Sequence, residues 1–416
     1  MSRRLALLAA LVAALAGTSA PASSAAVPHV DHVFIVVLEN ESAAATFGQS
    51  TEIPYLARTL AAKGAYVPNY YATGHESLDN YISMVSGQAP NVQTQADCQT
   101  FNEFLPGIAT GDGQFIGQGC VYPVGVQNIA TQLEGAGYTW RGYMQDMASS
   151  APAEPSSCRH PAIGSPDSTQ NATPTDQYAA RHNPFVYFHS IIDSPTCEQN
   201  DVDLSRLGPD LASKATTPNY AFITPDLCND GHDEPCVDGQ PGGMKQADAF
   251  LRGLVPQILA SPAYRDRGLL LITFDEAEGE PGDGDASACC NEQPGPNTPN
   301  PGGLIPGPGG GRIGAVMLSP CIQPGTVSQV AYNHYSQLRS IESNFGLPLL
   351  GYAGQAGLEP FGAELLNRPG CPVPGKKCKK KKNRHRKHAK HASEAKKKHK
   401  HKKCKRKRRP KHKGRR

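Results

Sequence analysis

Four short runs of consecutive apolar, often β-branched residues predict the main strands of this 416-residue chain. A strand that is buried on both faces has such a continuous run, whereas a half-exposed strand alternates apolar and polar residues. The runs span residues 33–38, 220–224, 269–274 and 313–318. They therefore predict buried strands of a parallel sheet that is covered on both faces.

Five segments with helical character lie between or after these runs, at residues 54–63, 78–85, 126–136, 244–259 and 336–345. Strands that alternate with helices indicate an α/β fold with a mostly parallel central sheet and helices on both faces. Residues 146–215 are mixed and rich in turn formers, so we expect a small insertion or cap there. Residues 281–311 are dense in Gly and Pro and predict a long loop.

The N-terminus has the layout of a secretory signal peptide over residues 1–26. Arg3 and Arg4 precede an apolar run at residues 5–17, and small residues follow it. The run is short and Ala-rich for a membrane span, although an uncleaved anchor is the alternative. We expect a secreted or cell-envelope-associated protein with no transmembrane span in its mature chain, and one domain over residues 27–375.

Charge divides the chain into an acidic body and a basic tail. Residues 376–416 contain 25 Lys and Arg and a single acid, Glu394, which leaves 16 basic and 36 acidic residues in the rest. The tail has no apolar periodicity, so we expect it to be disordered. It could bind a polyanion, either an anionic cell-envelope polymer or a nucleic acid. The alternative is a solubility tail without a partner.

The cysteines and the overall composition narrow the class of protein. Twelve cysteines fit an oxidising compartment, and we expect the close-range pairs Cys98–Cys120, Cys158–Cys197 and Cys228–Cys236. A zinc cluster is the alternative, but the chain lacks the paired C-x-x-C motifs that would support it. A hydrophobic content of 38% excludes disorder of the whole chain. The single long apolar run, at the N-terminus, excludes a multi-span membrane protein.

Acidic and amide side chains directly follow two of the predicted strands. Glu39 and Asn40 follow the first strand, and Asp275 and Glu276 follow the third. The carboxyl ends of strands are where open α/β sheets bind ligands. Carboxylate and amide oxygens are hard ligands that suit a divalent cation, and adjacent buried acids repel unless a cation lies between them. The alternatives are a capped turn at residues 39–40 and a solvated acid pair at residues 275–276.

Ser77 directly precedes a predicted helix, at a place that favours an anion. Backbone N–H groups and the helix dipole would stabilise a phosphoryl group on its oxygen, and Asn80 lies one turn further on. The alternative is that Ser77 is only an N-cap. Residues 225–233 follow another strand with three carboxylates and His232, and suit either phosphate contacts or a turn. His334 could contact a phosphate or a leaving group, or could be a surface histidine.

These motifs, in this order, resemble the phosphoesterase family that includes bacterial acid phosphatases and phospholipases C. That family belongs to the alkaline phosphatase superfamily. The resemblance rests on residues 36–40, 74–87, 224–233, 273–276 and 333–342, and it covers about residues 30–352. The nucleophile segment of the family is usually His-Pro-Ser-x-Pro-Asn-Tyr. Glu76 and Asp79 depart from it, because they replace the two prolines.

The resemblance implies an alkaline-phosphatase-like fold and a phosphoesterase catalytic domain over residues 27–375. It implies a nucleophile that is transiently phosphorylated, one or more divalent metal ions of unknown identity, and histidines near the phosphate. The expected catalytic residues are Ser77, His232 and His334; the expected substrate-binding residues are His75, Asn80 and Asp226; the expected metal ligands are Glu39, Asn40, Asp275 and Glu276.

The expected activity is hydrolysis of a phosphoric ester by a secreted, metal-dependent enzyme. A phosphomonoesterase of the acid phosphatase type is the first expectation. The alternatives are a phospholipase C that acts on phospholipid head groups and a non-catalytic protein that binds the cell envelope through its tail. The presence of Ser77 and of every expected metal ligand speaks against the non-catalytic alternative.

Overall fold

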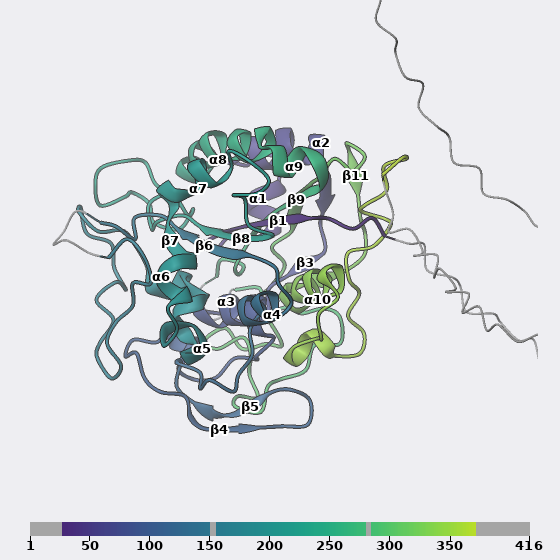
Figure 1. The fold of residues 1–416 in the computed structure, drawn as a ribbon. Coiled ribbons are helices and arrows are strands. Elements are labelled where there is room, and N and C mark those ends of the chain that lie inside the picture. Colours follow the sequence, from purple (N-terminus) through teal and green to yellow (C-terminus); the bar gives the residue numbers. More distant parts are fainter. Residues whose placement is uncertain (1–26, 150–154, 280–283, 372–416) are drawn as a thin grey trace, which may run out of the picture. The chain divides into compact units, whose positions relative to one another are not determined.

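A computed structural model describes residues 27–149, 155–279 and 284–371 of the chain (Figure 1). The predicted signal peptide at residues 1–26 and the predicted basic tail at residues 376–416 lie outside the described residues. Among the described residues, no helix combines the length and the apolarity needed to cross a membrane.

An eight-stranded sheet forms the centre of the described structure, in the order β11-β2-β10-β9-β1-β8-β6-β7. Strands β1, β6, β7, β8 and β9 run parallel to one another. The strand bounds are His32–Leu38 (β1), Ala65–Val67 (β2), Trp140–Met144 (β6), Asp201–Asp203 (β7), Tyr220–Thr224 (β8), Gly268–Phe274 (β9), Ala315–Leu318 (β10) and Thr326–Val327 (β11).

The four predicted strands are all present, as β1, β8, β9 and β10, and every residue in them is buried. Strand β1 lies between β8 and β9, with Val33 opposite both Tyr220 and Leu269. Strand β10, however, is antiparallel to β9 and β2. A continuous apolar run indicates that a strand is buried on both faces, but it does not indicate the direction of the strand. The prediction of a mostly parallel sheet therefore did not include the antiparallel strand β10.

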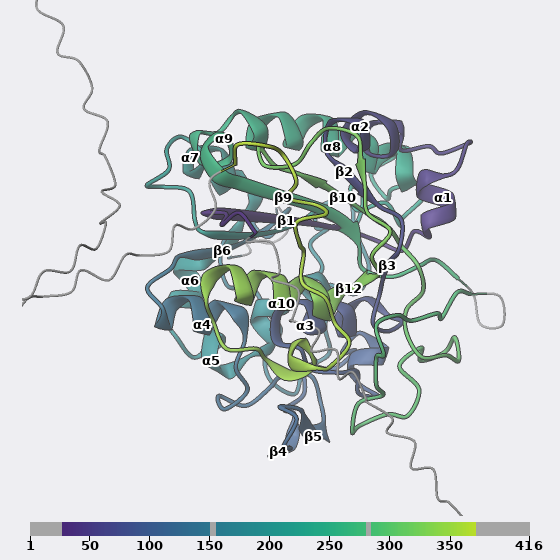
Figure 2. The same cartoon turned by 90° about the vertical axis from the view of Figure 1, so that its right-hand side faces the viewer.

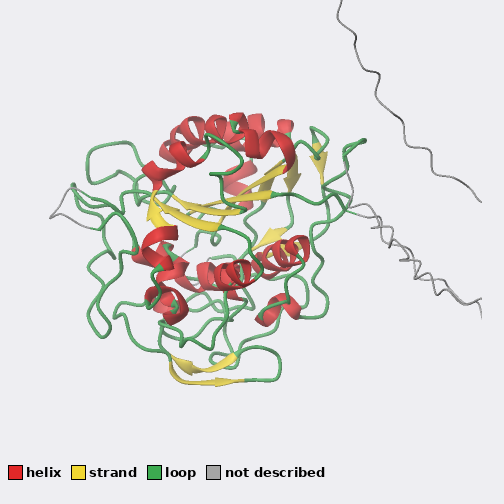
Figure 3. Ribbon diagram, viewed as in Figure 1, coloured by secondary structure: helices red, strands yellow, loops and turns green. Residues whose placement is uncertain are grey.

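Helices cover both faces of the sheet, as predicted (Figures 1, 2 and 3). Helices α2, α8 and α9 lie on one face, and α3, α4 and α10 lie on the other. The helix bounds are Ala43–Phe47 (α1), Ala61–Lys63 (α2), Ser77–Ser86 (α3), Ile129–Gly135 (α4), His189–Ile192 (α5), Thr196–Asn200 (α6), Leu207–Asp210 (α7), Gly243–Ala260 (α8), Pro262–Arg267 (α9) and His334–Phe345 (α10). Residues 55–60 form a π-helical segment that leads into α2.

Helix α8 illustrates how the sequence selects the buried face. Its buried apolar residues Ala247, Leu251, Leu254 and Ile258 recur at intervals of three and four. This spacing places them on one side of an α-helix, which can therefore pack against the sheet while Lys245 and Arg252 stay exposed.

The segments between the main elements carry four further short strands. Strands β3 (Tyr70–Tyr71) and β12 (Tyr332–Asn333) form a parallel pair, and β4 (Leu105–Ala109) and β5 (Phe115–Gln118) form an antiparallel hairpin. Residues 284–311 contain no helix or strand, in agreement with the predicted loop. The segment predicted as an insertion supplies β7, which is an edge strand of the central sheet. Whether residues 146–215 are an insertion relative to other proteins stays a prediction.

Five disulfides link described residues, and three of them are the predicted pairs Cys98–Cys120, Cys158–Cys197 and Cys228–Cys236. The other two join the neighbours Cys289 and Cys290, and Cys321 with Cys371. The five pairs confirm the expectation that the body carries disulfides, which fits an oxidising compartment.

Candidate functional site

The candidate site lies where the carboxyl ends of β1, β8 and β9 meet. Glu39 follows β1, and its N–H donates to the Asp230 carbonyl oxygen at 3.0 Å. Asn40 adopts a left-handed backbone conformation (φ 46°), and its N–H donates to Asp275 Oδ1 at 3.1 Å. Because β1 lies between β8 and β9, the loops after all three strands converge on Glu39 and Asn40.

Ser77 is the first residue of α3 and faces this edge of the sheet. Its Oγ donates to Glu39 Oε2 at 2.7 Å, and the Tyr81 hydroxyl, one turn further on, donates to Glu39 Oε1. Ser77 is buried, with 4% of its surface exposed. The carboxylate at the end of β1 therefore orients the serine hydroxyl that begins the helix.

The turn before Ser77 is held by Glu276. The N–H of Glu76 donates to Glu276 Oε2 at 3.1 Å, and His75 Nδ1 contacts the same oxygen. His75 Nε2 lies 3.0 Å from the Asp285 carbonyl oxygen. Glu76 has a positive φ of 74°, which is uncommon for a residue other than glycine. Glu276 thus fixes a strained turn that presents Ser77.

Asn80 holds the same turn from the inside of α3. Its Oδ1 accepts the N–H groups of Thr73 at 2.9 Å and Gly74 at 3.1 Å, and its Nδ2 donates to the Gly74 carbonyl oxygen at 2.8 Å. The Asn80 amide therefore already has backbone partners. Its predicted contact with substrate stays a prediction, and the structure assigns it a positioning role.

Asp97 caps the start of α3. Glu76, at the N-cap position, makes no capping hydrogen bond with its side chain. Instead Asp97 Oδ1 accepts the Leu78 N–H at 2.9 Å, and Asp97 Oδ2 lies 3.4 Å from Arg181 Nε. A side chain from a distant loop thus supplies the cap, next to the disulfide-bonded Cys98.

His182 is a site residue that sequence reasoning missed. Its Nε2 lies 3.4 Å from Glu39 Oε2, its Nδ1 lies 3.8 Å from Asp230 Oδ2, and its ring stacks on Tyr81. Both ring nitrogens lack a hydrogen-bond partner among the described residues. Burial lowers the pKa of His182 well below its usual value, so the ring is neutral at neutral pH.

The buried acidic groups of the site have raised pKa values. Burial raises the pKa of Glu39, and the charges of Asp275 and Asp230 raise it further. Burial likewise raises the pKa of Asp230 and of Asp275. Among the described residues, no hydrogen-bond partner reaches Asp230 Oδ2, Asp275 Oδ2 or Asn40 Oδ1. Unpartnered buried oxygens of this kind suit a hard divalent cation, which would satisfy their lone pairs and offset their charge.

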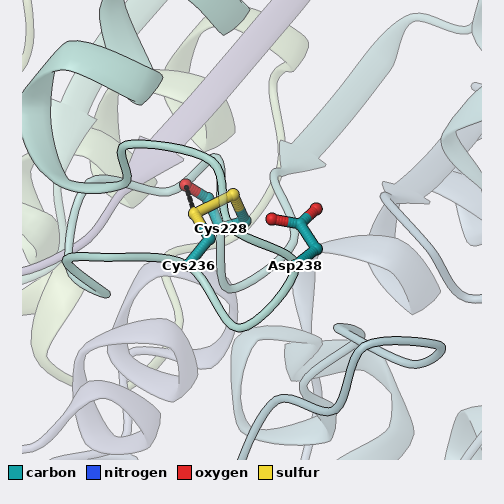
Figure 4. A group of neighbouring side chains, drawn as sticks. All are labelled: Cys228, Cys236 and Asp238. Carbon is teal, nitrogen blue, oxygen red and sulfur yellow. Dashed lines mark hydrogen bonds between the residues drawn. A yellow bond between two sulfur atoms is a disulfide. The ribbon is translucent and has the colours of Figure 1, made fainter.

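A different group of three possible metal-ligand side chains lies close together. In the described part of the chain, only Cys228, Cys236 and Asp238 form a group of three cysteine, histidine or acidic side chains with ligand atoms within 4.8 Å of one another (Figure 4). The two sulfur atoms are bonded to each other in a disulfide, so they cannot serve as thiolate ligands. This trio is therefore not a metal site, and the wider-spaced acids after β1 and β9 are the better candidates.

The two predicted catalytic histidines have opposite environments. His334, at the start of α10, is fully buried, and its Nε2 lies 2.6 Å from the Asp275 carbonyl oxygen. Burial lowers the pKa of His334 to about 4. His232 is exposed, and its hydrogen bond to Asp233 raises its pKa to about 9. At neutral pH only His232 of this pair is a cation.

A cavity of about 580 Å³ opens beside the turn that presents Ser77. Its wall combines ionisable side chains with two apolar ones from the long Gly-rich loop. The lining includes Asn40, His75, Glu76, His232, Glu276, Leu304 and Ile305. The cavity is large enough for a small phosphate ester.

Asp226 lies away from this wall and holds its own turn. Its Oδ1 accepts the N–H of Cys228 at 3.2 Å and of Asn229 at 2.9 Å. Burial raises its pKa to about 6. The predicted role of Asp226 in substrate binding stays a prediction, and its observed partners are those of a turn residue.

The model of one protein family, described as "Phosphoesterase family", matches residues 49–348. The chain belongs to the phosphoesterase family. It is therefore a hydrolase that acts on phosphoric ester bonds, as predicted. The family match includes Ser77, Asp275, Glu276 and the three histidines at positions 182, 232 and 334, whereas Glu39 and Asn40 lie just before it.

Curated relatives of this phosphoesterase are phosphatases. Phosphatidylinositol-3-phosphatase of Mycobacterium tuberculosis is 26% identical over 334 residues, covering 80% of this chain and 83% of that protein. A probable acid phosphatase of Kluyveromyces lactis is 25% identical over 321 residues, covering 76% of this chain and 59% of that protein. Acid phosphatase of Aspergillus fumigatus is 25% identical over 295 residues, covering 70% and 51%. The chain thus spans little more than half the length of these fungal proteins.

One solved structure of a protein in the alkaline phosphatase superfamily, from Vibrio parahaemolyticus, superposes with a TM-score of 0.47 and 12% identity. The superposition covers 82% of this chain and 74% of that chain. The α/β fold of this phosphoesterase rests on its own sheet and on the family match.

Proposed function

We propose that this phosphoesterase is a secreted, metal-dependent phosphomonoesterase of the acid phosphatase type with Ser77 as its nucleophile. The observation that carries the proposal is the hydrogen bond of 2.7 Å from Ser77 Oγ to Glu39 Oε2, at the start of a helix. The contact orients the Ser77 hydroxyl toward the acidic end of β1, and the preceding residues His75 and Glu76 line the cavity. The fungal acid phosphatase relatives support the same substrate class.

The proposed reaction begins with attack of Ser77 Oγ on phosphorus. The new Oγ–P bond forms as the P–O bond to the alcohol breaks, and the hydroxyl proton of Ser77 passes to Glu39 Oε2, which leaves a phosphoserine. Water then attacks that phosphorus and releases inorganic phosphate, and the proton returns from Glu39 to Ser77 Oγ. The positive end of the α3 dipole stabilises the negative charge of the phosphoryl oxygens throughout.

His232 is the proposed proton donor to the leaving group. It lines the cavity, is exposed, and has a pKa of about 9, so it carries a proton at neutral pH. A protonated imidazole can donate to the departing alkoxide oxygen and can accept a proton from the attacking water in the second step. His182 and His334 are buried and neutral, and His334 Nε2 holds the loop after β9 through the Asp275 carbonyl oxygen.

A divalent cation would be held by Glu39, Asn40, Asp275 and Glu276, with Asp230 close by. When bound, such an ion would neutralise a phosphate oxygen and lower the pKa of the Ser77 hydroxyl. The unpartnered oxygens of Asn40, Asp230 and Asp275 support this proposal.

A lipid phosphate is the second candidate substrate. The relative named phosphatidylinositol-3-phosphatase matches over 80% of this chain and 83% of its own length, more of its length than any of the acid phosphatases. A phospholipase C activity on head groups is a different reaction at the same site. Turnover of p-nitrophenyl phosphate but not p-nitrophenyl phosphorylcholine would favour a monoesterase and exclude the phospholipase.

Secretion and the role of the tail are also proposals. The five disulfides of the described body support an oxidising compartment. The 25 cations of residues 376–416 support electrostatic retention on an anionic envelope polymer or nucleic acid.

Ser77→Ala tests the nucleophile. The variant should fold, because loss of one hydroxyl at a helix start costs about 1 kcal/mol, and it should lose turnover of p-nitrophenyl phosphate. Ser86→Ala is the matched control, since Ser86 is a buried serine at the other end of α3 that donates to the Ile82 carbonyl oxygen. It should keep near-normal turnover. Normal turnover by Ser77→Ala, with phosphate release measured directly, would refute the assignment.

A further inference from the structure

The β4–β5 hairpin presents an exposed apolar face. Leu105, Ile108 and Ile116 are 65%, 57% and 44% exposed. Ile108 lies directly opposite Ile116, and Leu105 lies opposite Gln118, two residues along the strand from Ile116. Side chains of paired residues point to the same face, so all three apolar side chains share one face. Figures 1 and 2 place this hairpin at the end of the described body away from α8 and α9.

The opposite face of the hairpin is covered at β5 but not along β4, where Pro106 and Ala109 are exposed. A Cβ atom on Gly117 would lie 2.5 Å from the buried Phe104 ring, so the ring packs directly on the strand. The outer edge of β5 is also occupied, because Asn297 accepts the Gly117 N–H and donates to the Phe115 carbonyl oxygen, both at 2.8 Å. An added strand therefore cannot pair with β5 at that edge.

Charge is almost absent from this part of the chain. Residues 104–133 contain one charged residue, Asp112, although 19% of the whole chain is charged. The remainder of the body is strongly acidic and would be repelled by an anionic surface. The hairpin is thus the place where the body could touch such a surface without that repulsion.

The size of the face favours a lipid surface over a protein partner. A stable protein interface uses about 20 to 30 residues a side, far more than this hairpin offers. Binding at a membrane interface needs only a few apolar side chains together with electrostatic attraction to anionic lipids. The 25 cations of residues 376–416 would supply that attraction.

One loop connects the hairpin with the cavity beside Ser77. Asn297 bonds the edge of β5, and Leu304 and Ile305 of the same loop line the cavity. Leu304 is 67% exposed. A surface that touches the hairpin would therefore be joined to the rim of the cavity by eight residues of chain.

We propose that the apolar face of the β4–β5 hairpin docks on a bilayer that contains anionic lipids. This docking does not rest on the proposed function, because it requires no turnover.

The test is co-sedimentation of the full chain with vesicles of phosphatidylcholine and phosphatidylserine, at low salt and at 0.5 M NaCl, where the tail is screened. Ile108→Glu/Ile116→Glu should weaken binding by about tenfold or more at both salt concentrations, because two apolar side chains no longer enter the interface. Val327→Glu is the matched control, since Val327 is 54% exposed in β11, and it should bind as the unaltered chain does. Turnover of p-nitrophenyl phosphate should be equal in all three proteins.

Three results would overturn the docking proposal: no sedimentation of the unaltered chain, unchanged binding by the hairpin variant, or equal loss in the Val327→Glu control. A hairpin variant that converts a dimer to a monomer without a change in vesicle binding would also overturn it and identify a protein interface. Hairpin-dependent binding by a chain without phosphatase activity would leave the docking intact and refute the proposed function instead.

Discussion

The pKa of Glu39, at the edge of the sheet, depends on the charge state of the neighbouring acids. Glu39, Asp230 and Asp275 are buried, and the charges of Asp230 and Asp275 disfavour ionisation of Glu39. A bound dication would lower the pKa of each of these acids, because it favours the charged form of every acid that contacts it. Metal affinity should therefore fall as the pH falls and these acids take up protons.

Asp275→Asn should lose bound metal and phosphatase activity together. The change keeps the size of the side chain and removes one negative charge, and a hard dication binds far more weakly to fewer anions. Metal content measured by mass spectrometry of the purified protein checks the loss. Asp238→Asn is the control, because Asp238 lies beside the Cys228–Cys236 disulfide, and its metal content should not change. Full metal occupancy in Asp275→Asn would place the ion elsewhere.

Sequence reasoning could predict Glu39, Ser77 and Asp275 because each stands directly after a strand or before a helix. His182 carried no such signal, since it lies in a turn-rich segment more than a hundred residues from Ser77. Its approach to Glu39 depends on stacking against Tyr81. The backbone partners of Asn80 and Asp226 could not be predicted either, because turns and ligand sites both use Asn and Asp side chains.

At the scale of elements, the position of Ser77 depends on what holds the start of α3. Asp97 and Glu276 come from separate loops, yet both accept N–H groups within one residue of Ser77. The long loop packs so closely here that a Cβ atom on Gly310 would lie 1.8 Å from the Gly74 carbonyl oxygen. The position of Ser77 thus depends on packing between loops as well as on its helix.

Asp97→Ala should lower both stability and turnover. It removes the acceptor for the Leu78 N–H and leaves the partly buried Arg181 without the Asp97 carboxylate, at a cost of about 1–3 kcal/mol in the free energy of unfolding. Asn128→Ala is the control, because Asn128 caps α4 through the Thr131 N–H. It should cost about 1 kcal/mol and leave kcat unchanged. Denaturant unfolding and steady-state kinetics measure the two effects. Unchanged kcat in Asp97→Ala would show that its cap does not position Ser77.

The elements that the sequence revealed are those with strong local patterns. Continuous apolar runs gave β1, β8, β9 and β10, and helical periodicity gave α8 within one residue of each end. Strands β6 and β7 were not predicted, because Arg141 interrupts the apolar run of β6 and β7 consists of one valine between two aspartates. Asp201 is tolerated in the sheet because Asn183 Nδ2 donates to it at 2.8 Å, a contact that sequence alone does not show.

At the scale of the whole molecule, opposite charges are separated along the chain. Deletion of residues 376–416 should hardly change turnover of a small phosphate ester, because every proposed site residue remains. Retention on an anionic resin at low salt should collapse, since the remaining chain carries an excess of acidic residues. Chromatography of both proteins over a salt gradient, beside a kinetic assay, measures the two quantities. Lost turnover, or unchanged retention, would contradict the division into a catalytic body and an anchoring tail.

The disulfide between Cys321 and Cys371 has a mechanical consequence. It closes a loop of sequence separation 50 that contains all of α10, including His334, and Cys371 is the last described residue before the tail. Were the tail fixed to an envelope polymer under flow, tension would enter the body at Cys371. The covalent bridge would pass that tension directly to Cys321, three residues beyond β10. The segment between the two cysteines would bear little load, so an enzyme pulled by its tail would keep α10 and the groups around Asp275 in place.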